Sequence, residues 1–258
     1  MKTRLVTALY DINRETKGDG RSISEYLIWL EQTLKLKCDL TVFTEKKFED
    51  FVKRHRNNGY DCEVVVCNFD EIPFYKYNEK IKNIIFSENY KFKMKDTNRI
   101  ECYLSEYNVI QYSKFDWITD VINRHNNYDF YFWIDAGISR FFGDFDLKNP
   151  WPNIKKIEKD KITIQGNNNF LQKFNTLDVN NYIWDNNCLM SGGIFGGGKD
   201  VMLHLNQEVN EFVYFLFQNE CFNNEQFAFP VIMKKNSNMF NVVTIFDGTP
   251  MPIFKFLS

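Results

Sequence analysis

The sequence has little of what several large protein classes require. Six cysteines occur in 258 residues, and they form no C-x-x-C pair and no dense framework. Because a chain of this length with 44% hydrophobic residues can bury a large core, we expect buried free thiols rather than a disulfide scaffold. Only three histidines occur, without a pairing pattern, so Ser-His and Cys-His nucleophile schemes have no support.

Basic charge and long apolar runs are also scarce. The formal net charge is −2, and the lysines alternate with acidic or apolar residues, whereas a nucleic-acid-binding protein shows a basic face. No apolar run is long enough to cross a bilayer, and the N-terminus has no secretory hydrophobic region. We therefore expect a cytoplasmic protein with no membrane span and no nucleic-acid partner.

The usual glycine motifs for nucleotides are missing. No G-x-G-x-x-G occurs, and the P-loop-like spacing from Gly193 to Lys199 fails because Asp200 replaces the Ser or Thr that holds Mg²⁺. The five glycines in the seven positions 192–198 predict close backbone approach and free N–H groups at the start of the next helix.

The apolar pattern alternates between strand-like and helix-like segments. Strands are expected at 3–10, 39–44, 62–68, 128–135, 161–165 and 240–246, and helices at 24–36, 45–57, 99–125, 199–218 and 223–235. This alternation predicts an α/β fold with a mostly parallel central sheet flanked by helices. No repeat or linker divides the chain, so we expect a single domain, with 166–198 as its elaborated part.

The most informative segment is 128–137. The five bulky apolar residues Phe130–Ile134 predict a strand buried on both faces, which ends at Asp135. In open α/β sheets, ligands bind at the carboxyl ends of the strands. Asp135 is therefore the first candidate for the chemistry, and the small residues Ala136 and Gly137 leave room for a ligand. The alternative is a structural Asp135 that caps a helix or pairs with Arg140.

Four other residues are weaker candidates. After the first strand, Arg14 could pair with a phosphate and Asp11 could accept from a ribose or a base, unless both belong to a surface loop. Glu225 lies at the start of a predicted helix. There its charge either interacts favourably with the helix dipole, or the side chain serves as a base or accepts from a sugar hydroxyl. Asp247 is either a second metal ligand or part of an Asp-Gly turn.

Five blocks, taken in order, carry a resemblance to a known family. They are Val6–Arg14, Gln111–Lys114, Trp133–Ile138, Ser191–Gly197 and Asn224–Gln226. Together they resemble the WlaTC/HtrL family of glycosyltransferase-like proteins. The resemblance implies a GT-A-like fold with a nucleotide-binding half (1–137) and an acceptor half (138–258). It also implies a nucleotide-diphosphate sugar as donor, UDP-sugar being favoured, and a glycan or other hydroxyl compound as acceptor.

The resemblance assigns roles to residues in these blocks. Asp135 matches the first carboxylate of the GT-A D-x-D metal motif, and Gly137 stands where the second is expected. A divalent metal, Mn²⁺ or Mg²⁺, would therefore need Asp247 or the donor diphosphate to complete its ligands. The other matching positions are Thr7, Ala8, Tyr10 and Arg14 for the nucleotide, Ser113 and Lys114 for base or phosphate, Gly192 and Gly193 for the donor sugar, and Glu225 as the acid that serves the acceptor or acts as base.

Two other functions compete with a glycosyltransferase. A non-catalytic protein that binds nucleotide sugars or glycans would keep the fold without the second metal carboxylate. A nucleotidyltransferase would show a loop rich in Gly and Lys or Arg straight after the first strand, and here such residues are loosely spaced.

Overall fold

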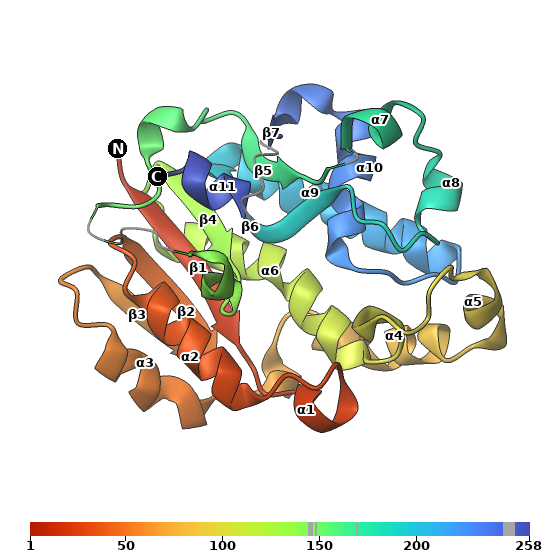
Figure 1. Ribbon diagram of the computed structural model, residues 1–258, viewed down its shortest axis with the longest axis horizontal. Coiled ribbons are helices and arrows are strands. Elements are labelled where there is room, and N and C mark those ends of the chain that lie inside the picture. The colour runs from red at the N-terminus through yellow and green to blue at the C-terminus, as the bar shows by residue number, and fades with distance from the viewer. Residues whose placement is uncertain (144–146, 148, 169, 245–250) are drawn as a thin grey trace.

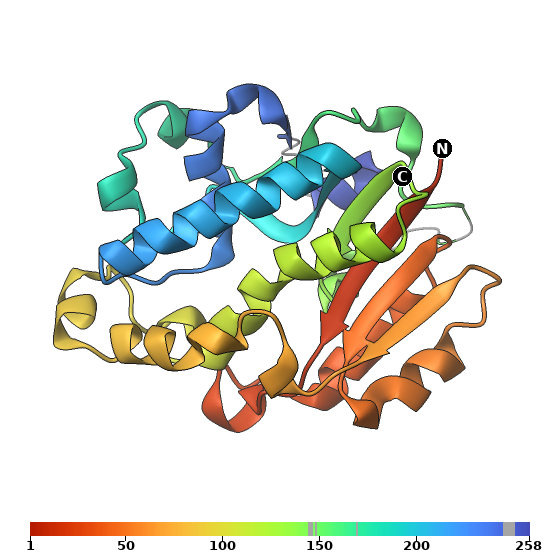
Figure 2. The ribbon, with the colours of Figure 1, turned by 180° about the vertical axis from the view of Figure 1, so that it is seen from behind.

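A computed structural model describes residues 1–143, 147, 149–168, 170–244 and 251–258. A seven-stranded sheet runs through the described part, with helices on both faces (Figures 1 and 2). The strands are β1 (Thr3–Leu9), β2 (Asp39–Thr44), β3 (Cys62–Val66), β4 (Phe130–Ile134), β5 (Ile162–Gly166), β6 (Met190–Gly198) and β7 (Phe240–Val243). The helices are α1 (Arg14–Lys17), α2 (Ile23–Leu34), α3 (Glu49–His55), α4 (Asn78–Ile85), α5 (Glu88–Lys93), α6 (Ser105–Arg124), α7 (Phe170–Asn175), α8 (Val179–Tyr182), α9 (Lys199–Gln218), α10 (Ala228–Lys235) and α11 (Pro252–Phe256).

The order of the strands confirms the predicted α/β class and the mostly parallel sheet. The order is β3-β2-β1-β4-β6-β5-β7, and β6 runs antiparallel to both of its neighbours, whereas the other pairings are parallel. From β1 the chain proceeds to β2 and β3 on one side, and then crosses to β4 on the other side. The strand order therefore reverses between β1 and β4, which is where open α/β sheets bind ligands.

Alternating side chains along the strands build one hydrophobic cluster on each face of the sheet. On one face Val6, Tyr131 and Trp133 pack with α6, α9 and α10, the layer seen in Figure 2. On the other face Leu5 and Phe132 pack with α2, α3 and α11. The strands β1 and β4 are thus buried on both sides, so their ends hold side chains in fixed positions.

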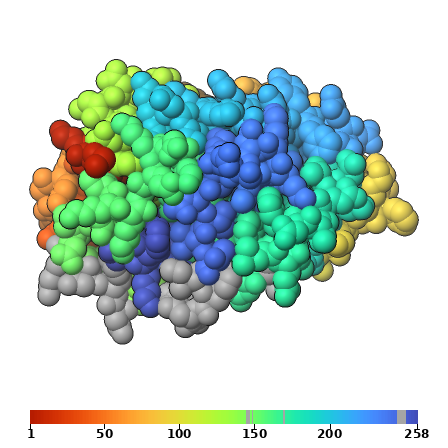
Figure 3. Space-filling view, turned by 90° about the horizontal axis from the view of Figure 1, so that it is seen from above, coloured from red at the N-terminus to blue at the C-terminus, as the bar shows by residue number. Residues whose placement is uncertain are grey.

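The second half of the chain completes the sheet and packs against the first. The strands β5, β6 and β7 come from residues 138–258, and the green, teal and blue segments of this half form most of the face in Figure 3. A hydrogen bond holds the C-terminal helix α11 against this half: the indole N–H of Trp151 donates to the carbonyl oxygen of Phe254 at 3.3 Å. The division into a nucleotide half and an acceptor half stays a prediction. Within the described residues, no helix is both long and apolar enough to cross a bilayer.

Several predicted elements need correction. The helix expected at 45–57 is a 3-10 turn, Lys46–Phe48, followed by α3, and the helix expected at 223–235 begins as a 3-10 turn, Glu225–Phe227. The segment 166–198, for which the sequence predicts no helix, contains α7 and α8 before β6. Each of these segments is short and of polar or mixed composition, so its sequence pattern does not indicate the turns that tertiary packing forms.

The glycine-rich segment is the largest correction. The sequence predicts free N–H groups at a helix start, but the segment forms the interior strand β6, and the N–H of Gly198 donates to the carbonyl of Lys159 at 3.0 Å. The predicted close approach is present. A Cβ at Gly196 would overlap the ring of Phe132 and the carbonyl of Tyr131. The glycines therefore serve the packing of the sheet.

We expect Gly196→Ala to destabilise the protein. Because the added methyl group meets backbone as well as a buried ring, the free energy of unfolding should fall by about 1–3 kcal/mol, the usual cost of overpacking. Chemical denaturation would measure it. Ser191→Ala, on the same strand, adds no atoms and is the control; equal stability of the two variants would contradict the crowding.

Candidate active site

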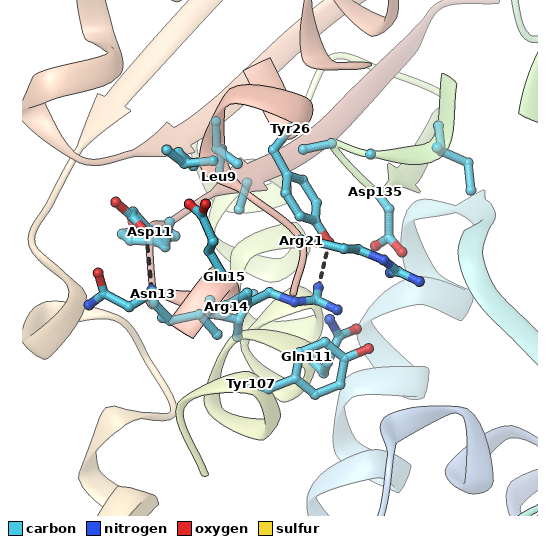
Figure 4. Close-up of a pocket in the computed structure, with 18 of the residues that line it drawn as sticks. Leu9, Asp11, Asn13, Arg14, Glu15, Arg21, Tyr26, Tyr107, Gln111 and Asp135 are labelled. Carbon is cyan, nitrogen blue, oxygen red and sulfur yellow. Dashed lines mark hydrogen bonds between the residues drawn. The ribbon is translucent and has the colours of Figure 1, made fainter. Parts of the chain in front are cut away.

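A cavity lies at the carboxyl ends of β1 and β4, where the strand order reverses. Its volume is ≈ 200 Å³. The chain after β1, helix α6 and the chain after β4 line it, together with the start of α2. In Figure 4 the side chains of Arg14, Tyr26, Tyr107 and Asp135 surround the same space. The location is therefore the one that the sheet topology predicts for a ligand.

Asp135 projects into this cavity and is bound to a buried lysine. The ammonium of Lys114 lies 3.0 Å from Oδ1 of Asp135 and 2.7 Å from Oε1 of Glu225, and its distance to the carbonyl oxygen of Gly192 is 3.3 Å. The indole N–H of Trp133 donates to the same Oδ1 at 2.6 Å. The side chain of Asp135 is 36% exposed, whereas those of Lys114 and Glu225 are 1% exposed. Asp135 is thus the carboxylate of the cluster that a ligand can reach.

Glu225 is the buried member of this cluster. Burial raises the pKa of Glu225 to about 7; the nearby Lys114 lowers it and the carboxylate of Asp135 raises it further. Its Oε2 has no hydrogen-bond partner in the described structure. A Cβ at Gly192 would overlap Oε1, so glycine at that position is what admits the carboxylate. Glu225 is absent from the lining of the cavity and reaches it through Lys114.

Arg14 forms a fixed cation on the opposite side of the cavity. Its guanidinium lies 5.4 Å from the ring centre of Tyr26 and 5.0 Å from that of Tyr107, which are cation–π distances. It pairs with Asp19 at 2.6 Å and donates to the hydroxyl of Tyr26 (Figure 4). Because two rings and an ion pair hold the side chain, Arg14 lines the cavity with little conformational freedom.

The structure brings most of the predicted site residues together. Those that line the cavity are Ala8, Tyr10, Asp11, Arg14, Lys114, Asp135, Ala136 and Gly137. Asp11 also pairs with Lys47 at 3.2 Å. Gly192 and Gly193 lie behind the cavity, where Gly192 adjoins Glu225 and the carbonyl of Gly193 accepts from the backbone N–H of Asp135 at 2.9 Å. Their contact with a donor sugar stays a prediction.

Thr7 and Ser113 are two further predicted residues that do not line this cavity, and the local geometry gives the reason. Thr7 is fully buried in the middle of β1, and its neighbour Ala8 points the other way and lines the cavity. Ser113 accepts from the backbone N–H of Phe74 at 3.2 Å, because one helical step turns it about 100° away from Lys114. Nothing places either residue against a nucleotide. Asp247 lies outside the described residues.

The sequence interpretation missed several residues that line the cavity. Tyr107, Ile110 and Gln111 lie on the face of α6 that also carries the predicted Lys114, at spacings of three and four residues, a signal that the sequence contains. Tyr26, Arg21 and Arg140 reach the cavity from separate segments, and no local pattern points to them.

The described residues do not fit a divalent metal. Mg²⁺ and Mn²⁺ prefer several oxygen ligands, but Oδ1 of Asp135 already binds Lys114 and the indole of Trp133. At Gly137, a Cβ would lie 3.0 Å from the ring of Tyr26 and 3.3 Å from Nη1 of Arg140, so a second carboxylate has little room there. No group of three His, Cys, Asp or Glu side chains in the described part of the chain is suited to a metal.

Glu225 should make the stability of the protein depend on pH. Its pKa rises from 4.5 in the unfolded chain to about 7, so its contribution is full below pH 4.5 and is lost as the pH rises through 7. We expect Glu225→Gln to remove this decline, which melting temperatures between pH 5 and pH 8 would show. Glu79→Gln, at a side chain that is 77% exposed, is the control. An unchanged slope in Glu225→Gln would contradict the raised pKa.

Comparison with known proteins gives a family and many distant structural similarities, of which three are described below. No curated protein matches the chain. Mouse xyloside xylosyltransferase 1 in its apo form is similar with a TM-score of 0.44 and 11% identity, covering 94% of this chain and 84% of that one. A glycosyltransferase involved in glycosylation of the major capsid of PBCV-1 has a TM-score of 0.41 and 10% identity, covering 95% and 82%.

The galactosyltransferase LgtC in complex with donor and acceptor sugar analogs has a TM-score of 0.45 and 10% identity, covering 93% of this chain and 73% of that one. At these scores the three similarities carry no argument about activity. The sequence profile of a family described as "Bacterial protein of unknown function (HtrL_YibB)" matches residues 1–257, nearly the full length. The chain belongs to the HtrL_YibB family, as its sequence blocks indicate.

Proposed function

We propose that this protein is a glycosyltransferase that moves a sugar from a nucleotide-diphosphate sugar to a hydroxyl acceptor. The observation that carries the proposal is the position of Asp135. This partly exposed carboxylate enters a cavity at the topological switch point, opposite the fixed guanidinium of Arg14. A ligand with a ring system, an anionic centre and hydroxyl groups matches a lining of aromatic, cationic and acidic side chains.

The cationic residues support binding of a diphosphate. Arg14, Arg21 and Arg140 line the cavity, and guanidinium groups match phosphate oxygens in shape and charge. Arg14 is already ordered by Asp19 and the two tyrosines, so binding costs it little conformational entropy. Asp11 and Tyr10, at the end of β1, are the groups proposed for the nucleoside, with UDP as the favoured nucleotide.

Asp135 is the residue proposed to act on the donor sugar. Lys114 and Trp133 hold its Oδ1, and no described residue donates to its Oδ2, so that oxygen is free to accept from a sugar hydroxyl. Glycosyl transfer passes through an oxocarbenium-like state, which a fixed negative charge stabilises. The arginines neutralise the charge that develops on the leaving diphosphate. Both effects strengthen when the ligand excludes water from the cavity.

Glu225 is proposed as a positioning residue. The sequence predicts a catalytic role for it, but its carboxylate is buried against Lys114 and lies behind the cavity. It fixes Lys114, and Lys114 in turn fixes the orientation of Asp135. In this arrangement Glu225 does not touch the acceptor.

We expect a nucleotide-sugar donor to stabilise the protein. At a concentration of 100 Kd, one bound ligand adds about 2.7 kcal/mol, which raises the melting temperature of a protein of this size by about 5–10 °C. Asp135→Asn keeps the shape of the side chain but removes its charge, and should lower the transfer rate by about 10²-fold or more. A thermal-shift panel of UDP- and GDP-sugars, followed by assays of donor hydrolysis and transfer, tests both.

Asp120→Asn is the matched control, because this acid lies on the same helix as Lys114 but pairs with Arg124 at the surface. If no nucleotide sugar stabilises the protein, the proposal fails. If donors bind without hydrolysis or transfer across a broad acceptor panel, the protein is the non-catalytic binder that the sequence leaves as the alternative.

A further inference from the structure

The ammonium of Lys114 occupies the point where three oxygen atoms converge. These are Oε1 of Glu225 at 2.7 Å, Oδ1 of Asp135 at 3.0 Å and the carbonyl oxygen of Gly192 at 3.3 Å. Two carboxylates and a carbonyl are hard oxygen donors of the kind that surround Mg²⁺ or Mn²⁺ in proteins. Here a side chain supplies the cation instead.

Three segments far apart in the sequence build this arrangement. Lys114 extends from the middle of α6, Asp135 follows β4, and Glu225 begins the 3-10 turn Glu225–Phe227. The side chain of Lys114 is 1% exposed, so water does not compete for its three contacts. Its ammonium also lies 5.5 Å from the ring centre of Trp133, which adds a cation–π contact on a further side.

The surroundings of the cluster disfavour a second cation. Arg140 lies beside Gly137, the position of the missing second carboxylate, and Arg14 and Arg21 line the same cavity. A divalent ion at Asp135 would face Lys114 across the same carboxylate, and like charges at such distances repel strongly in a partly buried site. The negative charge that would attract a metal is already balanced by the protein.

We propose that Lys114 is the built-in cation of this site, and that the protein binds and turns over its donor without a divalent metal. The proposal rests on the glycosyltransferase function above, and adds that the charge placed near the donor comes from Lys114 and the cavity arginines. Lys114 acts on Asp135 and is a positioning residue.

The first test measures metal dependence directly. Binding of UDP to the wild-type protein, measured by calorimetry, should be the same within twofold in EDTA and in millimolar Mn²⁺, and Mn²⁺ alone should leave the melting temperature unchanged. Loss of UDP binding in EDTA, or saturable stabilisation of the wild type by Mn²⁺ alone, overturns the proposal. Failure of UDP and of every donor to bind in both conditions instead contradicts the proposed function on which it rests.

The second test asks whether Lys114 stands at a cation position, and it needs no donor. Lys114→Ala frees three oxygens around an empty space, so Mn²⁺ should now raise the melting temperature in a saturable way, and the added change Glu225→Gln should abolish the gain. If Mn²⁺ does not raise the melting temperature of Lys114→Ala, the assignment of Lys114 to a cation position is overturned. Lys114→Arg keeps the charge and should remain insensitive to Mn²⁺; if Lys114→Ala does not fold, this variant and the wild-type titration still decide.

Lys235 offers a matched control. Its ammonium also lies between two carboxylates, those of Glu208 at 2.9 Å and Glu211 at 2.7 Å, but it is 55% exposed and far in sequence from the cavity residues. Lys235→Ala should gain no Mn²⁺ response. An equal rise in melting temperature in both variants would show that any carboxylate pair freed of its lysine binds the ion, and would overturn the special role of Lys114.

Discussion

The contact between Lys114 and the two acids Asp135 and Glu225 is the interaction on which the site depends. A buried ammonium is costly unless charged partners and hydrogen bonds surround it, and here the partners come from both halves of the chain. The contact links α6 on one face of the sheet to the end of β4 and to the turn before α10. Removing Lys114 would leave Glu225 buried without a balancing charge, and removing either acid would leave the buried ammonium with one partner fewer, so the three residues act as a unit.

The sheet explains why Asp135 and Lys114 face the cavity. Phe130–Ile134 are buried on both sides, so β4 has one position in the sheet, and the first residue that can leave the core is Asp135. The neighbouring end of β1 supplies the opposite wall. The geometry of the cavity is thus set by two of the most deeply buried strands, whereas Arg14, Arg21 and Arg140 come from short segments around them.

The sequence predicts much of this arrangement where periodicity is strong. The strand 39–44 and the helix 199–218 have the predicted bounds, and Asp135 lines the cavity as expected. The prediction fails where an offset of one residue decides whether a side chain reaches the cavity, or where contacts with residues distant in the sequence decide the local structure. Thr7 is one residue from Ala8, and Ser113 is one residue from Lys114, yet only the second of each pair reaches the cavity. The strand β6 was not predicted, because its glycines are required by the close approach of Phe132 and Lys159. These contacts come from distant parts of the sequence and leave no local pattern.

The reversed direction of β6 has a consequence for how Asp135 is held. Because this strand runs against its neighbours, its beginning, near Gly192 and Gly193, lies at the same edge as the ends of β1 and β4. The chain that leads into β6 therefore arrives behind Asp135 from the C-terminal half, where the carbonyl of Gly193 accepts from the backbone N–H of Asp135. A change in the length or direction of that chain would shift the backbone support of Asp135 while β1 and α6 kept their places. The antiparallel strand thus couples the exposed carboxylate to the second half of the chain.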